Sequence, residues 1–294
     1  MELAKDWLDS KRGRLKASSV EQFEVALRQL KAHFGTFPVR EITTSACHDW
    51  EKQRGGEIGA SAFNLERSIL IGVLNFALRE SLLLENPTLV IVRRKISKSQ
   101  VIIPSKDQFA LLVNTMRSRD PRTWIAADLV ELLAYSGMRV AEATALTWGE
   151  IDFAQCRFTV SGGIKGTKNG EVRVVPLFLA MRSLLERKRS ETAPNPSERV
   201  IPITTAQKAI ESACKKSRLP RFHHHLFRHF FVSQAIEAGI DFKTIAAWVG
   251  HKDGGLLVAK TYGHLRDTHS AEMAKRMTFA ATLQSAFVNS NTPN

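Results

Sequence analysis

The sequence has few cysteines and no long apolar run, and each absence excludes a class of protein. Cys47, Cys156 and Cys214 are odd in number and far apart, which fits neither a disulfide framework nor the ligand spacing of a small zinc site. No segment approaches the roughly 18 to 20 consecutive apolar residues of a membrane span. The first residues also lack the basic and then apolar pattern of a signal peptide. We therefore expect no membrane segment and a cytoplasmic location.

Acidic residues are in short supply, and the resulting charge points to a polyanionic partner. The 294 residues include 42 Lys and Arg against 29 Asp and Glu, a formal net charge of +13. The rest of the composition, 44% hydrophobic and 24% charged, is ordinary for a folded protein of one or two domains. Counterion release favours nucleic acid as the partner of such a basic chain, although basic proteins with other partners exist.

Residues 1–87 have the periodicity of amphipathic helices and no strand pattern. Ser18-x-x-Glu21 matches the capping box that begins many helices. Glycines interrupt the apolar pattern, Gly35 after the first segment and Gly55-Gly56 after the second. We predict a small all-α bundle of three helices, within residues 18–35, 44–55 and 63–78.

A basic stretch, residues 88–103, connects this bundle to the rest of the chain. Arg93, Arg94, Lys95 and Lys98 carry four positive charges with no acid among them. Such a connector can follow the phosphate backbone of DNA, or it can be a solvated linker and nothing more. We predict DNA contacts from these four side chains.

Residues 104–277 combine helices with short strands, which predicts a mixed α+β domain. An apolar helical pattern from Ile125 to Leu133 meets Ser136-Gly137, and a helical pattern resumes at Val140. Two strand-like runs with a glycine-rich stretch between them predict a β-hairpin. The expected strands are residues 157–160, 172–175 and 199–203, and the later helices are expected at 227–238 and 241–249.

Arg139 follows the Gly137 turn at the start of a helix, with Glu142 three residues on. Residues three apart on a helix are neighbours, so Glu142 can orient the Arg139 guanidinium. A helix N-terminus with a guanidinium beside it suits phosphate. The pair is a candidate anion site, although an exposed Arg–Glu pair on a helix is usually structural.

Lys168 lies in Gly166-Thr-Lys-Asn-Gly170, between the two strands of the expected hairpin. From a hairpin tip its ammonium can reach a bound ligand. Lys165 is the competing candidate, and most lysines at hairpin tips are only solvated.

The segment His223-His224-His225-Leu-Phe-Arg228-His229 is the densest chemical cluster in the chain. On a helix His225 and Arg228 share a face, which sets a proton-accepting imidazole beside a second guanidinium. His225 and His229 can also bind zinc, but no Glu follows His225 as in the metalloprotease helix and no third ligand is evident. Solvated histidines are the remaining interpretation.

Gly250-His251 follows the last predicted helix, and Tyr262 comes eleven residues after His251. Tyr135, the other tyrosine, sits in an apolar helix and is expected in the core. Tyr262 lies among small and polar residues beside Gly263, so its hydroxyl can be presented to a ligand, although a single exposed tyrosine is usually only surface.

In this order, these residues resemble the tyrosine site-specific recombinases of the phage integrase family. The resemblance covers roughly residues 1–275 and rests on Ser-Gly-Met-Arg-Val-Ala-Glu, His-Leu-Phe-Arg-His, Val-Gly-His-Lys-Asp and Thr-Tyr-Gly-His-Leu. Three features depart from the common pattern. The chain starts almost directly at the core-binding helices, so it is expected to be either a short member or a longer member truncated before these helices, where many members have an arm-binding domain. Leu226 follows His225 where a polar residue is frequent, and the interval from His251 to Tyr262 is long.

The resemblance implies two domains that form a clamp around DNA. The expected parts are an all-α, SAM-like core-binding domain at residues 1–87, the basic linker at 88–103, and a catalytic domain at 104–277 of the tyrosine recombinase and type IB topoisomerase type. The tail, residues 278–294, carries an apolar stripe of Phe279, Leu283 and Phe287. Family resemblance suggests that this stripe docks on a neighbouring protomer, and docking on its own domain is the alternative.

The resemblance also implies a role for each candidate residue. DNA strands are cut and rejoined through a covalent 3′-phosphotyrosine on Tyr262, without metal or other cofactor. The supporting roles fall to Arg139 and Arg228 on the non-bridging oxygens, His225 as proton acceptor, Lys168 as general acid, His251 as a further donor to the phosphate, and Glu142 as a support for Arg139.

Three other functions stay open at this point: a type IB topoisomerase, a non-catalytic DNA-binding regulator, and a metal-dependent nuclease built on the histidines. The partners expected for the recombinase are duplex DNA at attachment or core sites and a homotetramer on synapsed DNA that assembles from monomers. Accessory DNA-bending or excision factors are further candidates. The expected setting is the nucleoid of a bacterial or phage-infected cell.

Overall fold

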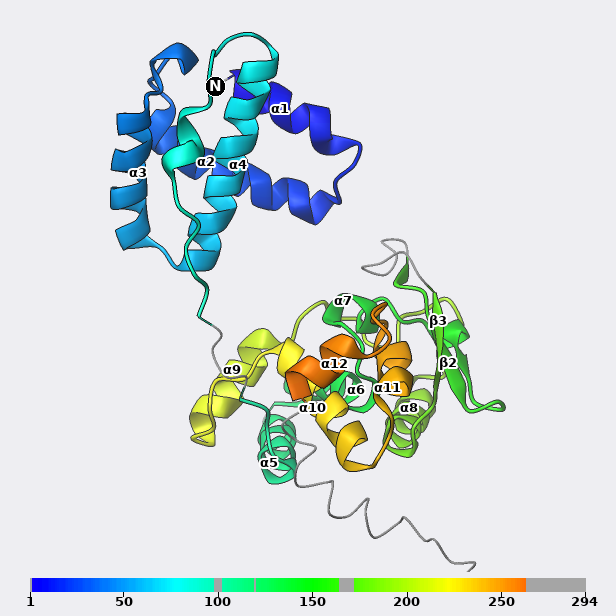
Figure 1. Ribbon diagram of the computed structural model, residues 1–294. Coiled ribbons are helices and arrows are strands. Elements are labelled where there is room, and N and C mark those ends of the chain that lie inside the picture. Colours follow the sequence, from blue (N-terminus) through cyan, green and yellow to red (C-terminus); the bar gives the residue numbers. More distant parts are fainter. Residues whose placement is uncertain (1, 98–101, 119, 164–171, 263–294) are drawn as a thin grey trace, which may run out of the picture. The chain divides into compact units, whose positions relative to one another are not determined.

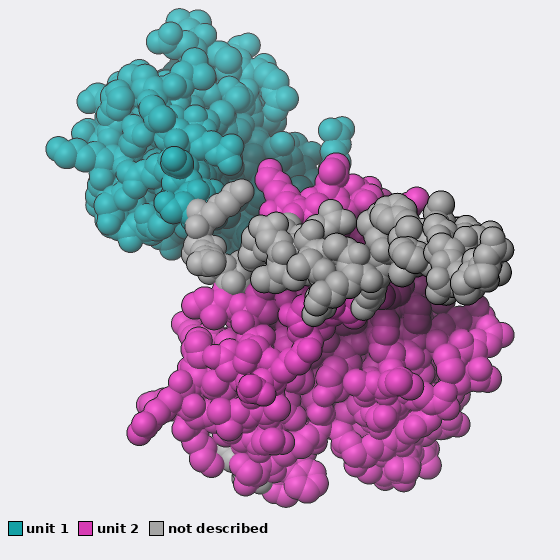
Figure 2. All heavy atoms as spheres, turned by 60° about the horizontal axis from the view of Figure 1, so that its bottom comes forward, with its two compact units in different colours: residues 1–100 teal, residues 101–294 magenta. Residues whose placement is uncertain are grey.

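The computed structural model describes residues 2–97, 102–118, 120–163 and 172–262. The chain divides into two compact units, residues 1–100 and residues 101–294, which Figure 2 shows in different colours. Within the described ranges no helix is long and apolar enough to cross a membrane.

Unit 1, over its described residues, is a helical bundle with an aromatic core. Trp50 and Phe63 are fully buried and stack with their ring centroids 5.1 Å apart, and Phe34 packs against Trp50. These rings come from three different helices and join them into one core. The elements are α1 (Glu2–Arg12), α2 (Ala17–Phe34), η1 (Val39–Glu41), α3 (Thr44–Glu57), α4 (Ala60–Arg79) and η2 (Pro87–Val90) (Figure 1).

Two helix boundaries in unit 1 correct the sequence prediction. The capping box at Ser18 is wrong, because α2 begins at Ala17 and its N-cap is Lys16. The break at Gly55-Gly56 is also wrong, because α3 continues to Glu57. A Cβ atom on Gly55 would lie 1.6 Å from Nη2 of Arg94. This glycine therefore lets a guanidinium pack against the helix backbone and does not end the helix.

Unit 2, in the part of the chain that the structure describes, combines helices with a small sheet. The sheet has the antiparallel order β1-β2-β3, and Phe158 of β2 lies opposite Val175 of β3, both fully buried. The elements are α5 (Lys106–Arg117), η3 (Pro121–Thr123), α6 (Trp124–Ser136), α7 (Val140–Ala143), η4 (Trp148–Glu150), β1 (Ile151–Asp152), β2 (Arg157–Val160), β3 (Arg173–Pro176), α8 (Leu179–Thr192), α9 (Gln207–Lys216), α10 (His224–Glu237), α11 (Phe242–Val249) and α12 (Leu256–Tyr262).

The predicted fold class, an all-α unit followed by a mixed α+β unit, is confirmed. The predicted hairpin strands pair as expected, with the second beginning at Arg173. The strand predicted at residues 199–203 is wrong, because the chain there forms only an isolated bridge between Thr147 and Arg199. The short strand β1 had no sequence prediction.

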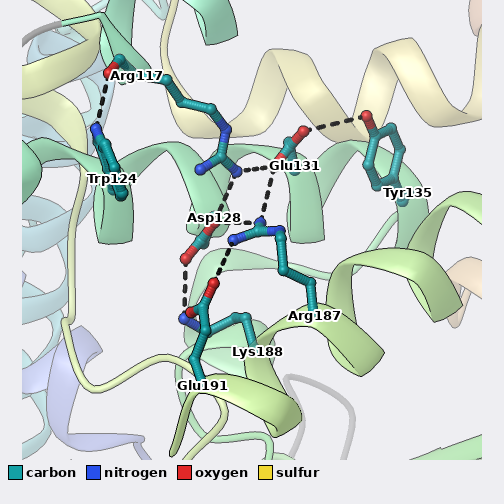
Figure 3. A network of polar contacts seen from close by, with 8 residues as sticks. All are labelled: Arg117, Trp124, Asp128, Glu131, Tyr135, Arg187, Lys188 and Glu191. Atoms are coloured by element: carbon teal, nitrogen blue, oxygen red, sulfur yellow. Dashed lines mark hydrogen bonds and ion pairs between the residues drawn. The ribbon is translucent and has the colours of Figure 1, made fainter.

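Helix α6 runs through the centre of unit 2 and contacts α5, α8 and α10. Its one acidic core residue, Asp128, is 3% exposed and is neutralised by three cations. Lys188 Nζ lies 2.8 Å from Oδ2, and the Nη2 atoms of Arg117 and Arg187 each lie 2.7 Å from Oδ1 (Figure 3). Hydrogen-bonded pairing is what allows a charge to be buried. The network ties α6 to α5 and α8.

Candidate active site

The Gly137 turn delivers Arg139 from the end of α6. Gly137 is the C-cap of α6 with φ 64°, and its N–H donates to Leu133 O at 3.0 Å. A Cβ on this residue would lie 2.4 Å from Cδ1 of Phe231. Both the left-handed backbone and the close approach of α10 therefore require glycine. Two residues later Arg139 is the N-cap of α7.

Glu142 holds Arg139 from within the core. Its carboxylate, 2% exposed, accepts from the backbone N–H of Arg139 at 3.0 Å and from Arg139 Nη1 at 3.0 Å. The neighbour relation predicted from the spacing therefore exists in the structure. Arg139 itself is 23% exposed, so its guanidinium is reachable from solvent.

Arg173, at the start of β3, is a functional candidate that the sequence analysis missed. Its guanidinium meets Glu142, with Nη2 2.7 Å from Oε2, and its Nε donates to Trp248 O at 2.8 Å. Burial opposes ionisation of Glu142, but the hydrogen bonds and charge of Arg173, with those of Arg139, hold the pKa of Glu142 below its ordinary value. Glu142 is therefore a carboxylate at neutral pH.

Arg228, on the first turns of α10, is buried, with 4% exposure. Its Nη1 donates to Gly137 O at 2.7 Å, and its Nη2 donates to Val249 O at 2.6 Å. Nη2 also lies 2.9 Å from Nε2 of His251. One guanidinium thus joins the turn before Arg139 to the end of α11.

His251 is a neutral imidazole with a defined tautomer. Burial and the charge of Arg228 lower its pKa to about 4. Since guanidinium only donates, Nε2 must accept from Arg228, and the ring proton then sits on Nδ1. Nδ1 is buried and has no hydrogen-bond partner among the described residues. Within the described ranges, the site therefore holds an N–H donor that has no acceptor and lies beside the guanidinium of Arg228.

The other histidines of the cluster have different contacts and exposures. His224 Nε2 accepts from Ala206 N at 2.9 Å, which satisfies a donor at the start of α9. His225 is exposed, and its ring meets that of His229 edge to face with centroids 4.7 Å apart. Burial, then the charges of His225 and Arg228, lower the pKa of His229 to about 4. His223 and His225 are the exposed histidines of the cluster, and His225 lies three residues before Arg228 on α10.

Tyr262 is the last residue of α12, a helix that packs on α11. Val258 of α12 is fully buried with Ile245 and Val249 of α11. The backbone of Tyr262 is therefore carried by the element that follows the His251 loop. Lys165 and Lys168 lie outside the described residues, as does the tail at residues 278–294.

The predicted linker contacts divide into two kinds. Arg94 belongs to unit 1: its guanidinium lies over the Phe63 ring, 4.3 Å from the centroid, and donates to Gly55 O. Its backbone exchanges two hydrogen bonds of 2.9 Å with the Asn64 side chain. Arg93 and Lys95 are exposed on either side, and Lys98 lies outside the described residues.

A metal centre finds little support in the described part of the chain. No group of three or more His, Cys, Asp or Glu side chains there is placed to hold a metal ion. What the described residues offer is a cluster of fixed N–H donors, Arg139, Arg228 and His251, which suits an anion with several oxygens.

Comparison with known families agrees with this chemistry. Residues 104–269 match the phage integrase family, and residues 1–53 match the N-terminal SAM-like domain of phage integrases. The first match alone spans more than half of the chain. The chain therefore belongs to the phage integrase family, whose members are tyrosine recombinases, enzymes that break and rejoin DNA strands by transesterification.

Curated relatives carry the same class of name. Tyrosine recombinase XerC of Alcanivorax borkumensis is 25% identical over 275 residues, which cover 88% of this chain and 87% of that protein. Tyrosine recombinase XerD of Neisseria meningitidis serogroup A is 25% identical over 200 residues, 64% of this chain and 66% of that protein. Tyrosine recombinase XerC of Xanthomonas campestris matches over 154 residues, 46% of its own length.

Solved structures share the fold. A lambda integrase dimer bound to a COC′ core site superposes with a TM-score of 0.73 at 19% identity, over 86% of this chain and 95% of that one. The Tn1549 transposon integrase in complex with a circular intermediate DNA gives a TM-score of 0.71 at 17% identity, over 93% and 99%. At these identities the likeness establishes the architecture.

Proposed function

We propose that the chain is a site-specific DNA recombinase that forms a transient 3′-phosphotyrosine bond through Tyr262 and integrates or excises a mobile element. The observation that carries the proposal is the donor cluster of Arg139, Arg228 and the Nδ1–H of His251. Arg139 is held by Glu142 of α7, which Arg173 of β3 also binds. Arg228 of α10 is held by the backbone carbonyls of Gly137 and of Val249 in α11. Donors fixed in advance are what a phosphoryl-transfer transition state requires.

The first step is attack on phosphorus. The Tyr262 oxygen forms a bond to the scissile phosphorus as the bond to the 5′ oxygen breaks. Charge that builds up on the non-bridging oxygens is met by the two guanidinium groups and by His251. Arg228 is well suited to this because its position is set by two backbone carbonyls before DNA arrives.

Two proton transfers accompany the attack. A free tyrosine has a pKa of about 10, so the phenol must lose its proton as it attacks. His225, exposed beside Arg228, takes that proton, and Lys168 gives one to the departing 5′ oxygen. The reverse step uses the same groups when a 5′ hydroxyl attacks the phosphotyrosine. One phosphoester replaces another, so no nucleotide is consumed.

The working assembly is proposed to be a homotetramer on two DNA sites. The lambda integrase tetramer bound to a Holliday junction has the same fold, with a TM-score of 0.73 at 18% identity. The basic charge of the chain supports duplex DNA as the partner. Accessory DNA-bending or excision factors complete the proposal for an integrating element.

The test replaces the nucleophile and traps the covalent bond. The probe is a pool of random-sequence duplexes, each nicked at a varied position. When the chain cuts near a nick, the short fragment beyond the cut diffuses away, the strand cannot be rejoined, and the covalent adduct accumulates. The DNA in the SDS-resistant complexes of the wild-type chain is sequenced, and one duplex identified in this way, the site duplex, is used in the assays. We expect Tyr262→Phe to bind this duplex with unchanged affinity and form no adduct. Tyr135→Phe, the matched control, should form adduct at the wild-type rate.

Other outcomes point to other functions. An adduct from Tyr262→Phe would disprove the assignment of the nucleophile. Binding without adduct from the wild-type chain would indicate a DNA-binding regulator. Relaxation of supercoiled plasmids without any selected site would indicate a topoisomerase, and cleavage abolished by EDTA would indicate a metal-dependent nuclease.

A further inference from the structure

Arg173 joins three segments that are far apart in the sequence. It begins β3, the strand that follows residues 164–171, where Lys168 lies. Through Nη2 and Nη1 it meets both carboxylate oxygens of Glu142, at 2.7 and 3.3 Å. Through Nε it donates to Trp248 O at 2.8 Å, near the end of α11. With 11% exposure, its side chain is held inside the unit.

Each of these segments leads to a proposed active-site group. Glu142 binds both the backbone and the guanidinium of Arg139. Trp248 is followed two residues later by Gly250, where a Cβ atom would lie 3.0 Å from Nη1 of Arg173. His251 comes next. The guanidinium of Arg173 thus lies against the backbone that presents His251 as well as against the carboxylate that holds Arg139.

The charges explain why a second arginine is needed. Arg139 and Arg173 share one carboxylate, so the pair keeps an excess positive charge while each guanidinium is only partly neutralised. Without Arg173, Glu142 would be a buried carboxylate with Arg139 as its only cation among the contacts described. It would then draw Arg139 inward, away from a phosphate, and would be easier to protonate.

We infer that Arg173 is a positioning residue of the recombination site, acting through Glu142 on Arg139 and through the Trp248 carbonyl on the His251 loop. The inference rests on the proposed function and adds to it a residue outside the six groups assigned to the chemistry. Arg173 touches neither DNA nor the reacting atoms in this role.

The experiment measures single-turnover cleavage of the nicked site duplex at saturating protein. We expect Arg173→Met to bind the duplex normally and to cleave it about 10²-fold more slowly, the size of effect that misplacement of a reacting group produces. Arg173→Lys keeps the charge near Glu142 but cannot reach both partners, so it should fall between wild type and Arg173→Met. Arg117→Met, which removes an arginine from the Asp128 network, is the matched control and should lower the melting temperature while cleaving at the wild-type rate.

Two further readouts separate positioning from general destabilisation. Arg173 holds the pKa of Glu142 low, so removing Arg173 should raise that pKa. The acid limb of the pH–rate profile of Arg173→Met should therefore lie at higher pH than that of the wild type. In the Glu142→Gln background, Arg173→Met should cost much less than it does in the wild type, because the contact it serves is already gone.

The outcomes distinguish the two proposals. The inference is supported if the wild-type chain cleaves, Arg173→Met cleaves more slowly with its acid limb at higher pH, and the effect of Arg173→Met is smaller in the Glu142→Gln background. If the wild-type chain cleaves and either Arg173→Met or Arg173→Lys cleaves at the same rate, the inference is overturned. It is also overturned if the rate effects of the Arg173 and Glu142 substitutions multiply independently. If the wild-type chain forms no adduct at all, the proposed function fails and this inference fails with it.

Discussion

At the scale of single residues, two arginines of unit 2 act on backbone as well as on side chains. Arg228 donates to the carbonyls of Gly137 and Val249, and Arg173 donates to that of Trp248. A planar guanidinium can reach such partners in fixed directions, whereas an ammonium is a point charge on a flexible stem. The geometry of the donor cluster therefore depends on arginine in particular.

Lys168 and Lys165 can be separated by the chemistry of the leaving group. If Lys168 is the general acid, Lys168→Ala should be slow on normal DNA because a 5′ alkoxide leaves poorly without a proton. A duplex with sulfur at the bridging position releases a thiolate, which needs little protonation since thiols are far more acidic than alcohols. Cleavage of this duplex by Lys168→Ala should approach the wild-type rate, measured in single turnover.

Arg228→Ala is the control for that comparison. It should stay slow on both substrates, because sulfur restores neither its proposed contact with the non-bridging oxygens nor its bonds to the Gly137 and Val249 carbonyls. Rescue of Lys165→Ala instead would assign the acid to Lys165. If sulfur rescues neither variant, both lysines would bind phosphate without transferring a proton.

Sequence reasoning reaches side chains whose partners are close in the chain and misses the others. The contact of Arg139 with Glu142 follows from a spacing of three on a helix. Arg173 gave no such signal, because its partners, Glu142 and Trp248, lie 31 and 75 residues away. Arg94 looked like part of a basic run for the same reason: the Phe63 ring it covers belongs to α4.

At the scale of elements, the turn from α6 to α7 carries the most consequence. Gly137 takes a left-handed backbone, and Phe231 of α10 fills the space where a side chain would stand. The same residue offers its carbonyl to Arg228. One glycine thus sets the distance between α6 and α10 and the position of both proposed phosphate-binding arginines.

Gly137→Ala tests this turn. The strained backbone costs about 1 kcal/mol, and making room beside Phe231 adds about 2 kcal/mol. We expect the free energy of unfolding to fall by about 3 kcal/mol in total. The molecules that remain folded should also cleave DNA more slowly than the wild type. Denaturant unfolding and single-turnover cleavage measure the two effects.

Gly254→Ala is the matched control, because Gly254 also has a left-handed backbone, with φ 63°, but no atom within 4 Å of its would-be Cβ. It should show the backbone cost of about 1 kcal/mol alone. Equal destabilisation by the two substitutions would mean that Phe231 yields without cost and that the turn tolerates a side chain.

The elements that could be predicted are those whose pattern is local. Strand β2 occupies the predicted residues, and α6 ends at the predicted glycine. The strand expected at residues 199–203 has the right composition but finds a single bridging partner in Thr147. Likewise, Gly55 reads as a helix breaker until the guanidinium that packs on it is known.

At the scale of the whole molecule, the basic charge predicts binding that weakens with salt, and the linker arginines and lysines allow a test. We expect replacement of Arg93, Lys95 and Lys98 by Gln to flatten the slope of log affinity against log salt by about one unit for each lost phosphate contact. Affinity for the site duplex, measured by anisotropy over a range of salt, gives the slope.

Arg94→Gln is the internal comparison, because this arginine is engaged with Phe63 and Gly55. It should leave the slope nearly unchanged and lower the melting temperature of unit 1. A slope unaffected by the triple replacement would mean that the basic stretch does not touch DNA.

A descendant of this chain that no longer cut DNA would still need Arg228. Its guanidinium ties the Gly137 carbonyl to the Val249 carbonyl inside unit 2, so losing it would damage the fold whether or not any reaction took place. His225 is exposed and its proposed role lies in the reaction, so selection on that role would end once cutting ceased. Under the proposed roles, an intact His225 together with Tyr262 would identify a copy of this gene whose product still cuts DNA, whereas Arg228 would be retained in either case.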